Sequence, residues 1–394
     1  MKHIIATLLL LIMTTPCLMA QKTKASNPRH ELSQARSSIK SGKYDEAEKT
    51  LAKLLKDSTN RTNKKIWLAY YDAVCGQYEQ GNEKMYLKQK YDTATFFYKA
   101  LQMLNIAETL DSLAPEYRKS HSQQQNEYRP NVYNGGSFLV RKGKYAEAYN
   151  YYEAYLDCAR QPLFKAYDYS VNDKRMAEAA YWATYCGYKQ QNPVLTLRYH
   201  KQALKDTTKA DFTLQFVAEA RKWLNDDELY LQTLEEGFRR FPLFHYFFPR
   251  LMDAYTALGK DEKALETADS ALAINPNSEL FVFAKSTTLL RMERYAESIK
   301  YSEKLIAINP NFAEPYFNAG TAYVNIAGRL EERHEKKLMK QAYQKALPFM
   351  EKYRQMMPKQ KEKWAPVLYR IYLNLNMGKQ FDEIDRLLKE KNNN

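Results

Sequence analysis

The chain has 394 residues, enough to bury a large core, and only 12 glycines and 14 prolines, which leaves little turn chemistry for an all-β or α/β fold. Its formal net charge of +14 is spread along the chain and favours acidic partners or anionic envelope surfaces. A nucleic-acid partner is disfavoured, because the N-terminal residues resemble a secretory signal and no nucleic-acid-reading motif is found.

Residues 1–20 have the pattern of a secretory signal peptide. A basic start at Lys2 precedes the apolar run 4–13, which is too short to span a bilayer, and Ala20 supplies a small residue at the cleavage site. An uncleaved membrane anchor is the alternative. We therefore expect a periplasmic, cell-envelope or secreted protein, with no transmembrane segment in the mature chain.

The cysteines do not predict a disulfide. Cys17 raises the alternative of a lipid anchor, but Pro16 fits poorly before a lipidated cysteine, so ordinary signal cleavage is favoured. Cys158 and Cys186 are expected at opposite ends of antiparallel helices, with Cys186 about 20 Å along its helix at 1.5 Å per residue. Together with Cys75, they are predicted to be buried free thiols.

Helical periodicity continues through the mature chain and divides it into pairs of helices. After a polar leader at 21–29, the N-terminal part (30–158) holds pairs at 30–57, at 64–80 with 91–113, and at 130–141 with 145–158. Residues 58–63 link the first two pairs, 81–90 are an insertion, 115–129 predict either a helix or a loose connection, and 159–172 are a linker. A fourth pair covers 173–190 and 193–205.

From about residue 206 the pairs follow a regular period. Pro276 and Pro310 end two successive segments 34 residues apart, and stepping back by the same interval reaches Pro242. A period of this length indicates stacked repeats. We assign residues 173–310 to the regular 34-residue repeats. The next pair, 313–358, contains charged extra material at 327–345, read as one long projecting helix kinked near Pro348, and 362–391 form a closing pair.

The residues at fixed positions of the repeat resemble those of the tetratricopeptide repeat family. In one unit the large, turn-glycine, small, small and proline positions are Tyr255, Gly259, Ala264, Ala271 and Pro276. The next unit matches at Leu289, Tyr295, Leu305 and Pro310, but has Glu293 for the turn glycine and Ser298 for the first alanine. The turn signature also appears at 42–47 and 143–148, and 319–323 match a first helix. The unit at 206–242 matches weakly, with Asn225 at the turn and Gly237 at a small position.

The resemblance implies an all-α fold, a right-handed α-solenoid superhelix of about nine stacked antiparallel helix pairs, some with insertions. The sequence, with its Ala-Gln signal end and its many Lys, Tyr and Asn residues, is also similar to secreted repeat proteins of the Bacteroidota. In this family the first helices of the pairs line a concave groove that binds other proteins or peptides.

No enzyme signature is found. There is no glycine-rich phosphate loop and no Gly-x-Ser-x-Gly turn, and the six histidines are scattered without metal-ligand spacing. We therefore predict a non-catalytic protein with no cofactor and no metal. An enzyme with a site in the insertions at 81–130 or 327–345 is retained as the weakest alternative.

Projection of the family's groove positions gives a set of aromatic, basic and amide residues that suit a peptide partner. The alternative for each aromatic is simple packing between helices. The set is Tyr133, Asn134, Arg141, Tyr181, Trp182, Tyr185, Lys189, Phe216, Lys222, Trp223, Tyr246, Arg250, Phe283, Arg291, Phe317, Asn318 and Asn325.

These features predict a protein–protein interaction scaffold or adaptor of the cell envelope that holds a protein or peptide, with acidic partners favoured. The alternative is a glycan- or peptidoglycan-binding protein that stacks sugars on the same aromatic rings. The clamp with which the family's chaperone-tail readers hold a terminal carboxylate is not carried over, because its asparagines and basic residues are not arranged that way here.

Overall fold

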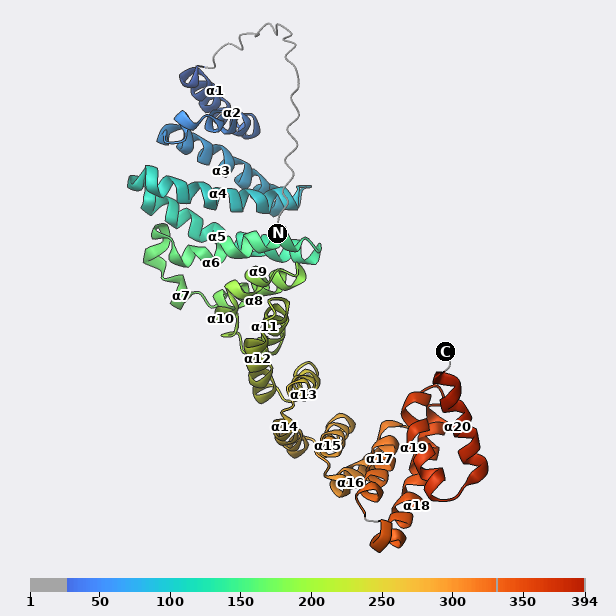
Figure 1. Ribbon diagram of the computed structural model, residues 1–394. Coiled ribbons are helices and arrows are strands. Elements are labelled where there is room, and N and C mark those ends of the chain that lie inside the picture. The colour runs from blue at the N-terminus through green and yellow to red at the C-terminus, as the bar shows by residue number, and fades with distance from the viewer. Residues whose placement is uncertain (1–26, 331, 393–394) are drawn as a thin grey trace, which may run out of the picture. The chain divides into compact units, whose positions relative to one another are not determined.

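Helices form all the regular structure in the part of the chain that the structure describes. The computed structural model describes residues 27–330 and 332–392, and it divides between Gln190 and Gln191 into two compact units. The all-α class with stacked helix pairs is confirmed (Figure 1). The predicted signal peptide and the lipid-anchor alternative at Cys17 lie outside the described residues.

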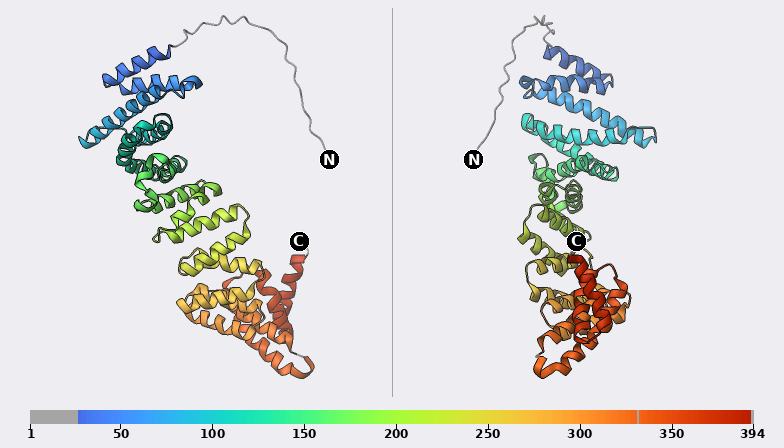
Figure 2. Two further views of the ribbon diagram at one scale, coloured as in Figure 1. Left: turned by 90° about the vertical axis from the view of Figure 1, so that its left-hand side faces the viewer. Right: turned by 45° about the vertical axis from the view of Figure 1, so that its right-hand side comes forward.

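In the first unit, helices follow one another as antiparallel neighbours, each packed on the next (Figure 2). Three short 3₁₀ segments and α7 (Tyr169–Asn172) connect the later ones. The main helices are α1 (Pro28–Lys40), α2 (Tyr44–Lys56), α3 (Lys64–Tyr86), α4 (Thr93–Leu113), α5 (Arg118–Arg141), α6 (Tyr145–Asp157) and α8 (Met176–Lys189).

The second unit begins with two short helices, α9 (Pro193–Arg198) and α10 (His200–Ala203), where one longer helix was expected. Five pairs follow. They are α11 (Ala210–Trp223) with α12 (Asp227–Arg240), α13 (Phe247–Ala257) with α14 (Asp261–Ile274), α15 (Glu279–Arg291) with α16 (Tyr295–Ile308), α17 (Glu314–Arg329) with α18 (Glu332–Met356), and α19 (Lys361–Asn374) with α20 (Gly378–Asn392).

The turns inside the pairs share one backbone geometry. Gly42, Gly143 and Gly259 have positive φ values of 75°, 72° and 63°. Asn225 and Glu293, which stand where glycine was expected, have φ values of 54° and 59°. In all five turns the following residue donates its N–H to a carbonyl near the end of the first helix, which is the Schellman arrangement. Two repeats that depart from the glycine pattern in sequence therefore keep its conformation.

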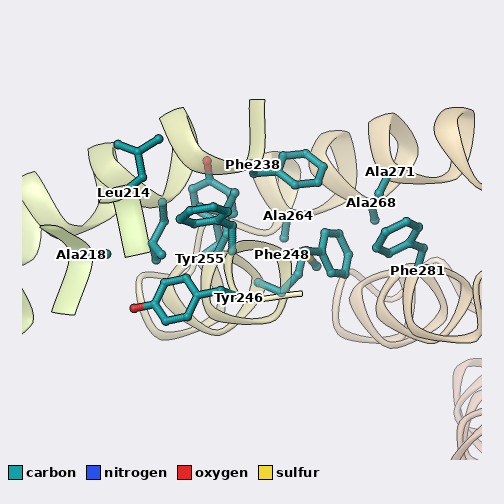
Figure 3. Packing of buried hydrophobic residues seen from close by; sticks show 14 residues of the cluster. Leu214, Ala218, Phe238, Tyr246, Phe248, Tyr255, Ala264, Ala268, Ala271 and Phe281 are labelled. Atoms are coloured by element: carbon teal, nitrogen blue, oxygen red, sulfur yellow. The ribbon is translucent and has the colours of Figure 1, made fainter. Parts of the chain in front are cut away.

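Small residues let the aromatic side chains of neighbouring helices meet in the core. The ring of Phe248 on α13 lies 5.7 Å from Phe238 on α12 and 4.6 Å from Phe281 on α15 (Figure 3). Ala264, Ala268 and Ala271 on α14 are fully buried beside these rings. Gly237 is equally constrained, because a Cβ there would lie 2.3 Å from the ring of Phe247. Burial of each such ring contributes roughly 1.5–3 kcal/mol.

Two predicted boundaries in the first unit are wrong. The insertion expected at 81–90 is largely helical, because α3 continues to Tyr86. The stretch 115–129, for which the sequence predicts either a helix or a loose connection, is a short 3₁₀ turn followed by helix. The helix predicted to start at residue 130 is therefore α5, which starts at Arg118 and runs through Pro130. Pro130 is exposed, while Gln125, Arg129 and Val132 on the same helix are buried. Packing of that buried face outweighs the local preference of proline to end a helix.

The predicted linker at 159–172 is a packed segment. Leu163, Phe164 and Tyr169 are buried, and the segment is folded into short helices. The Arg129 guanidinium lies 3.6 Å and 3.8 Å from the ring centroids of Tyr155 and Tyr169, so a buried cation holds this segment against α5 and α6.

The long projecting helix predicted in 313–358 is also corrected. α17 ends at Arg329, where Leu330 takes an extended conformation with ψ of 138°, and α18 begins at Glu332. These two helices pack against each other as a pair. The non-helical residue inside α18 is Glu335, whereas Pro348 lies within the helix. The charged extra residues therefore lengthen the turn end of one pair.

Candidate partner-binding surface

The structure brings together one group of predicted groove residues in the first unit, which we call the α8 cluster: Trp182, Tyr185 and Lys189 on α8 with Tyr145 at the start of α6. The ring centroids of Trp182 and Tyr185 are 5.6 Å apart, those of Tyr185 and Tyr145 are 5.8 Å apart, and Lys189 Nζ lies 5.4 Å from the Tyr145 ring. Lys189 is exposed and the three aromatics are half-buried. The cluster offers ring surface beside a cation.

Helical spacing explains how this cluster forms. Trp182, Tyr185 and Lys189 are three and four residues apart, so they lie on one side of α8. The sequence pattern identifies Tyr145 only as the aromatic residue of a turn signature. In the structure its ring also contacts Tyr185 on the next long helix, α8. Burial raises the pKa of the Tyr185 hydroxyl to about 12, and the neighbouring Tyr145 hydroxyl adds to the shift, so Tyr185 stays neutral at physiological pH.

The other predicted residues of the first unit are divided between core and surface. Tyr133 and Tyr181 are buried, and the Tyr133 ring packs on Tyr155 at 5.6 Å. Their role as groove contacts is corrected to packing between helices. Asn134 and Arg141 are exposed on α5, at the positions on their helix that Trp182 and Lys189 occupy on α8.

In the second unit, three predicted groove residues are buried in the stack. Phe216 and Tyr246 are 4% and 2% exposed, and the Tyr246 hydroxyl donates to Glu219 at 2.9 Å. Asn318 is 5% exposed and donates to Ser286 and Thr287 at 3.2 Å and 3.1 Å. These side chains join helices, and their assignment to a binding surface is corrected.

Two predicted cations in the second unit are engaged within the stack. The Arg250 guanidinium lies 3.9 Å from the Tyr246 ring centroid, and Arg291 donates to Asp261 at 3.0 Å and to Thr256 at 2.7 Å. An incoming carboxylate would compete with these contacts. The α8 cluster has the clearer arrangement for a partner.

The remaining predicted residues of the second unit lie partly or fully at the surface. Lys222 is exposed, while Trp223 and Asn325 are half-buried. Phe283 packs on Phe312 at 5.2 Å, and Phe317 packs on Tyr353 at 5.1 Å.

The three described cysteines are free and buried, as predicted. Burial raises the pKa values of the Cys75 and Cys186 thiols to about 12, so they are protonated and poorly nucleophilic at neutral pH. Within the described residues, no three His, Cys, Asp or Glu side chains come together as a metal site. No helix of that part has the length and apolar character to cross a bilayer.

Comparison with known families and proteins identifies one repeat directly. Residues 282–312, which cover most of α15 and all of α16, match the family model described as tetratricopeptide repeat. Comparison with curated proteins gives no significant match.

Several solved structures are similar to parts of the chain at low identity. The crystal structure of YrrB, described as a TPR protein with an unusual peptide-binding site, is 16% identical over 48% of this chain and 89% of its own, with a TM-score of 0.37. MamA from Desulfovibrio magneticus RS-1 is 17% identical over 46% and 96%, with a TM-score of 0.37. The C-terminal part of a TPR repeat-containing protein from Cytophaga hutchinsonii is 14% identical over 64% and 92%, with a TM-score of 0.43.

Proposed function

We propose that the chain, in which residues 282–312 match the tetratricopeptide repeat, is a non-catalytic interaction scaffold that holds a protein or peptide partner on the first helices of its repeats. The observation that carries the proposal is the α8 cluster. Its half-buried rings can cover apolar side chains of a partner, and its exposed cation can attract a carboxylate.

The charge of the chain supports an acidic partner. The net charge of +14 raises the encounter rate with acidic proteins, and Lys189 places a positive charge directly beside the aromatic surface. A cell-envelope or secreted location, as the signal-like residues 1–20 predict, is part of the proposal. The similarity to secreted proteins of the Bacteroidota stays a prediction.

The test is capture of partners from envelope extract by the full mature chain and by the variant Trp182→Ala/Lys189→Ala. The matched control is Tyr86→Ala/Lys84→Ala, which removes an aromatic and a cation that are both exposed at the end of α3. Each variant is first shown to keep the helical signal. We expect a protein captured by the wild type and the control to be lost from the α8 variant.

A partner that binds all three forms equally would refute the assignment to the α8 cluster. Digestion of the extract with trypsin before capture separates the two ligand classes. Peptide binding is abolished by digestion, whereas binding that survives digestion and still depends on Trp182 would favour the glycan alternative.

A further inference from the structure

A recessed furrow lies in the first unit, among helices that precede α8. It is a cavity of about 660 Å³ between α4 and α6, with α5 beneath. Its apolar lining comes from Phe97, Tyr98, Leu101, Phe138 and Tyr151, and Gly135 forms part of its floor. The walls belong to the second helices of two neighbouring pairs, so the furrow is distinct from the groove that the first helices line.

The preceding gap between second helices is built differently. Between α2 and α4, Lys99 Nζ contacts the Glu48 carboxylate at 2.6 Å and 2.7 Å, and Gln102 donates to the same carboxylate at 2.7 Å. Lys99 is 6% exposed, so this network bridges the two helices from inside. Between α4 and α6 the cavity is lined by Phe97, Tyr98, Leu101 and Tyr151, with Thr95, Glu147 and Asn150 as polar neighbours.

Gly135 contributes to the shape of the furrow. A Cβ at this position would lie 2.5 Å from the Tyr151 ring and 3.0 Å from Cβ of Phe97. Both walls therefore approach the bare backbone of α5, and an entering group would meet ring surfaces on both sides. The volume lies in the range of pockets that bury small ligands or side chains, roughly 300–1,000 Å³.

The rim of the furrow is cationic. Lys142, at the end of α5, is exposed and its Nζ lies 5.8 Å from the Phe138 ring centroid. The second rim cation, Lys144, is 3.0 Å from Glu147 Oε1, so that carboxylate is already neutralised. Lys142 can thus face a ligand's negative charge while the rings below it take an apolar group.

We propose that this furrow is a second binding site, for an extended segment of a partner protein that carries a large apolar side chain next to an acidic residue. The apolar side chain enters between Tyr98 and Phe138, and the carboxylate pairs with Lys142 at the rim. The furrow lies between α4 and α6, whereas the α8 cluster lies on α8 and the first residue of α6, so the scaffold can hold two segments at once in its first unit.

The test is selection of displayed random octapeptides on the full mature chain, followed by affinity measurement with synthetic copies of the selected peptides. Variants are Tyr98→Ala, which removes a wall that is 53% exposed, and Lys142→Glu. Matched controls are Tyr86→Ala and Lys119→Glu, an exposed aromatic and an exposed lysine outside the furrow.

We expect a consensus of an aromatic or aliphatic residue beside Asp or Glu, with affinity about tenfold weaker for Tyr98→Ala because much of the wall surface is lost. Lys142→Glu should lose the acidic peptides and select basic ones, and the controls should bind like the wild type. Selection of peptides without acidic residues, or equal affinity of wild type and both furrow variants, would overturn the proposal.

The Trp182→Ala/Lys189→Ala variant separates this inference from the proposed function. It should bind the furrow peptides normally. If the selected peptides lose affinity for the Trp182→Ala/Lys189→Ala variant but not for Tyr98→Ala or Lys142→Glu, the scaffold function stands and the furrow proposal fails. If they depend on Tyr98 and Lys142 alone, the furrow is a site, and the α8 assignment is decided separately by the capture from envelope extract.

Discussion

Replacement of Arg129 by methionine should destabilise the first unit, because it removes a buried cation together with its hydrogen bonds. In the wild type, Arg129 Nη1 donates to Asp173 at 2.6 Å and Nη2 donates to the Tyr155 carbonyl at 3.0 Å. The guanidinium is also sandwiched between the rings of Tyr155 and Tyr169. Methionine keeps much of the apolar stem and removes the charge, so the variant isolates the polar contacts.

The magnitude follows from burial. Arg129 is 5% exposed, and removal of one partner from a buried ion pair typically costs about 3–5 kcal/mol, because the other partner stays desolvated. The Asp173 side chain is 14% exposed and accepts a second hydrogen bond, from the Tyr155 hydroxyl at 2.6 Å. Since Asp173 can partly rehydrate, we expect a loss near the lower end, about 3 kcal/mol.

The variant should also change the response to acid. Burial alone would raise the pKa of Asp173, but hydrogen bonds from Tyr155 and Arg129 outweigh it and lower the pKa below its usual value. A carboxylate with a lowered folded-state pKa stabilises the fold above its unfolded-state pKa, and this contribution disappears as pH falls through the folded-state value. In Arg129→Met the pKa of Asp173 should rise, so less stability is left to lose on acidification.

The assay is urea unfolding at neutral pH combined with hydrogen exchange over residues 159–173. The matched control is Arg175→Met, because Arg175 is exposed and its guanidinium lies 5.7 Å from the Tyr133 ring. That control should change stability by less than about 0.5 kcal/mol. If Arg129→Met is within 1 kcal/mol of the control, or if exchange in 159–173 does not increase, the claim that this cation fixes the segment is wrong.

Three further changes test other parts of the fold. Gly259→Ala should lower the free energy of unfolding in urea by about 1 kcal/mol, because φ is +63°. A Cβ there meets no neighbouring atom, so backbone strain is the whole cost. Gly237→Ala should cost about 1–3 kcal/mol, because its Cβ would overlap the Phe247 ring; equal effects of both glycine variants would contradict this distinction. Burial alone would raise the pKa of Glu48, but hydrogen bonds, chiefly from Lys99, lower it, so its contribution is lost as pH falls through the folded-state pKa. Glu48→Gln should therefore flatten the acid side of the Tm–pH curve, and an unchanged curve would refute the role of this network.

The sequence predicts the repeat unit well, because its signals are local. The spacing of Pro276 and Pro310 and the buried alanines of α14 depend only on helix ends and on close packing within one pair. The turn at Glu293 was less predictable. A glutamate with φ of 59° has no local preference for that conformation, and the two helices that it joins impose it.

The irregular parts of the first unit could not be predicted from local pattern. Pro130 suggested a helix boundary, yet the buried contacts of Arg129 and Val132 on either side carry the helix past it. Residues 159–172 suggested a linker, yet Asp173 at the end of this stretch accepts a hydrogen bond from buried Arg129, 44 positions earlier in the chain. Contacts between residues so far apart leave no periodic trace in one sequence.

The candidate binding surface shows the same limit at the level of single residues. Asn134, Trp182, Phe216 and Arg250 each precede a turn residue of positive φ by nine positions, so periodicity places them on equivalent faces of their helices. Their surroundings nevertheless differ: Asn134 is exposed, Trp182 is half-buried beside a lysine, Phe216 is buried, and Arg250 stacks on a tyrosine.

Repeat position determines which way a side chain points, but the size and charge of its neighbours determine whether a partner can reach it. At the same repeat position, Trp182 with Lys189 leaves ring surface and a cation accessible, whereas Phe216 contributes its ring to the core. A Trp182→Ala substitution should therefore reduce partner binding with little change in urea stability. Phe216→Ala should lower stability by about 3–5 kcal/mol. If both substitutions acted mainly on stability, the α8 cluster would be part of the core and the proposed surface would have to lie elsewhere.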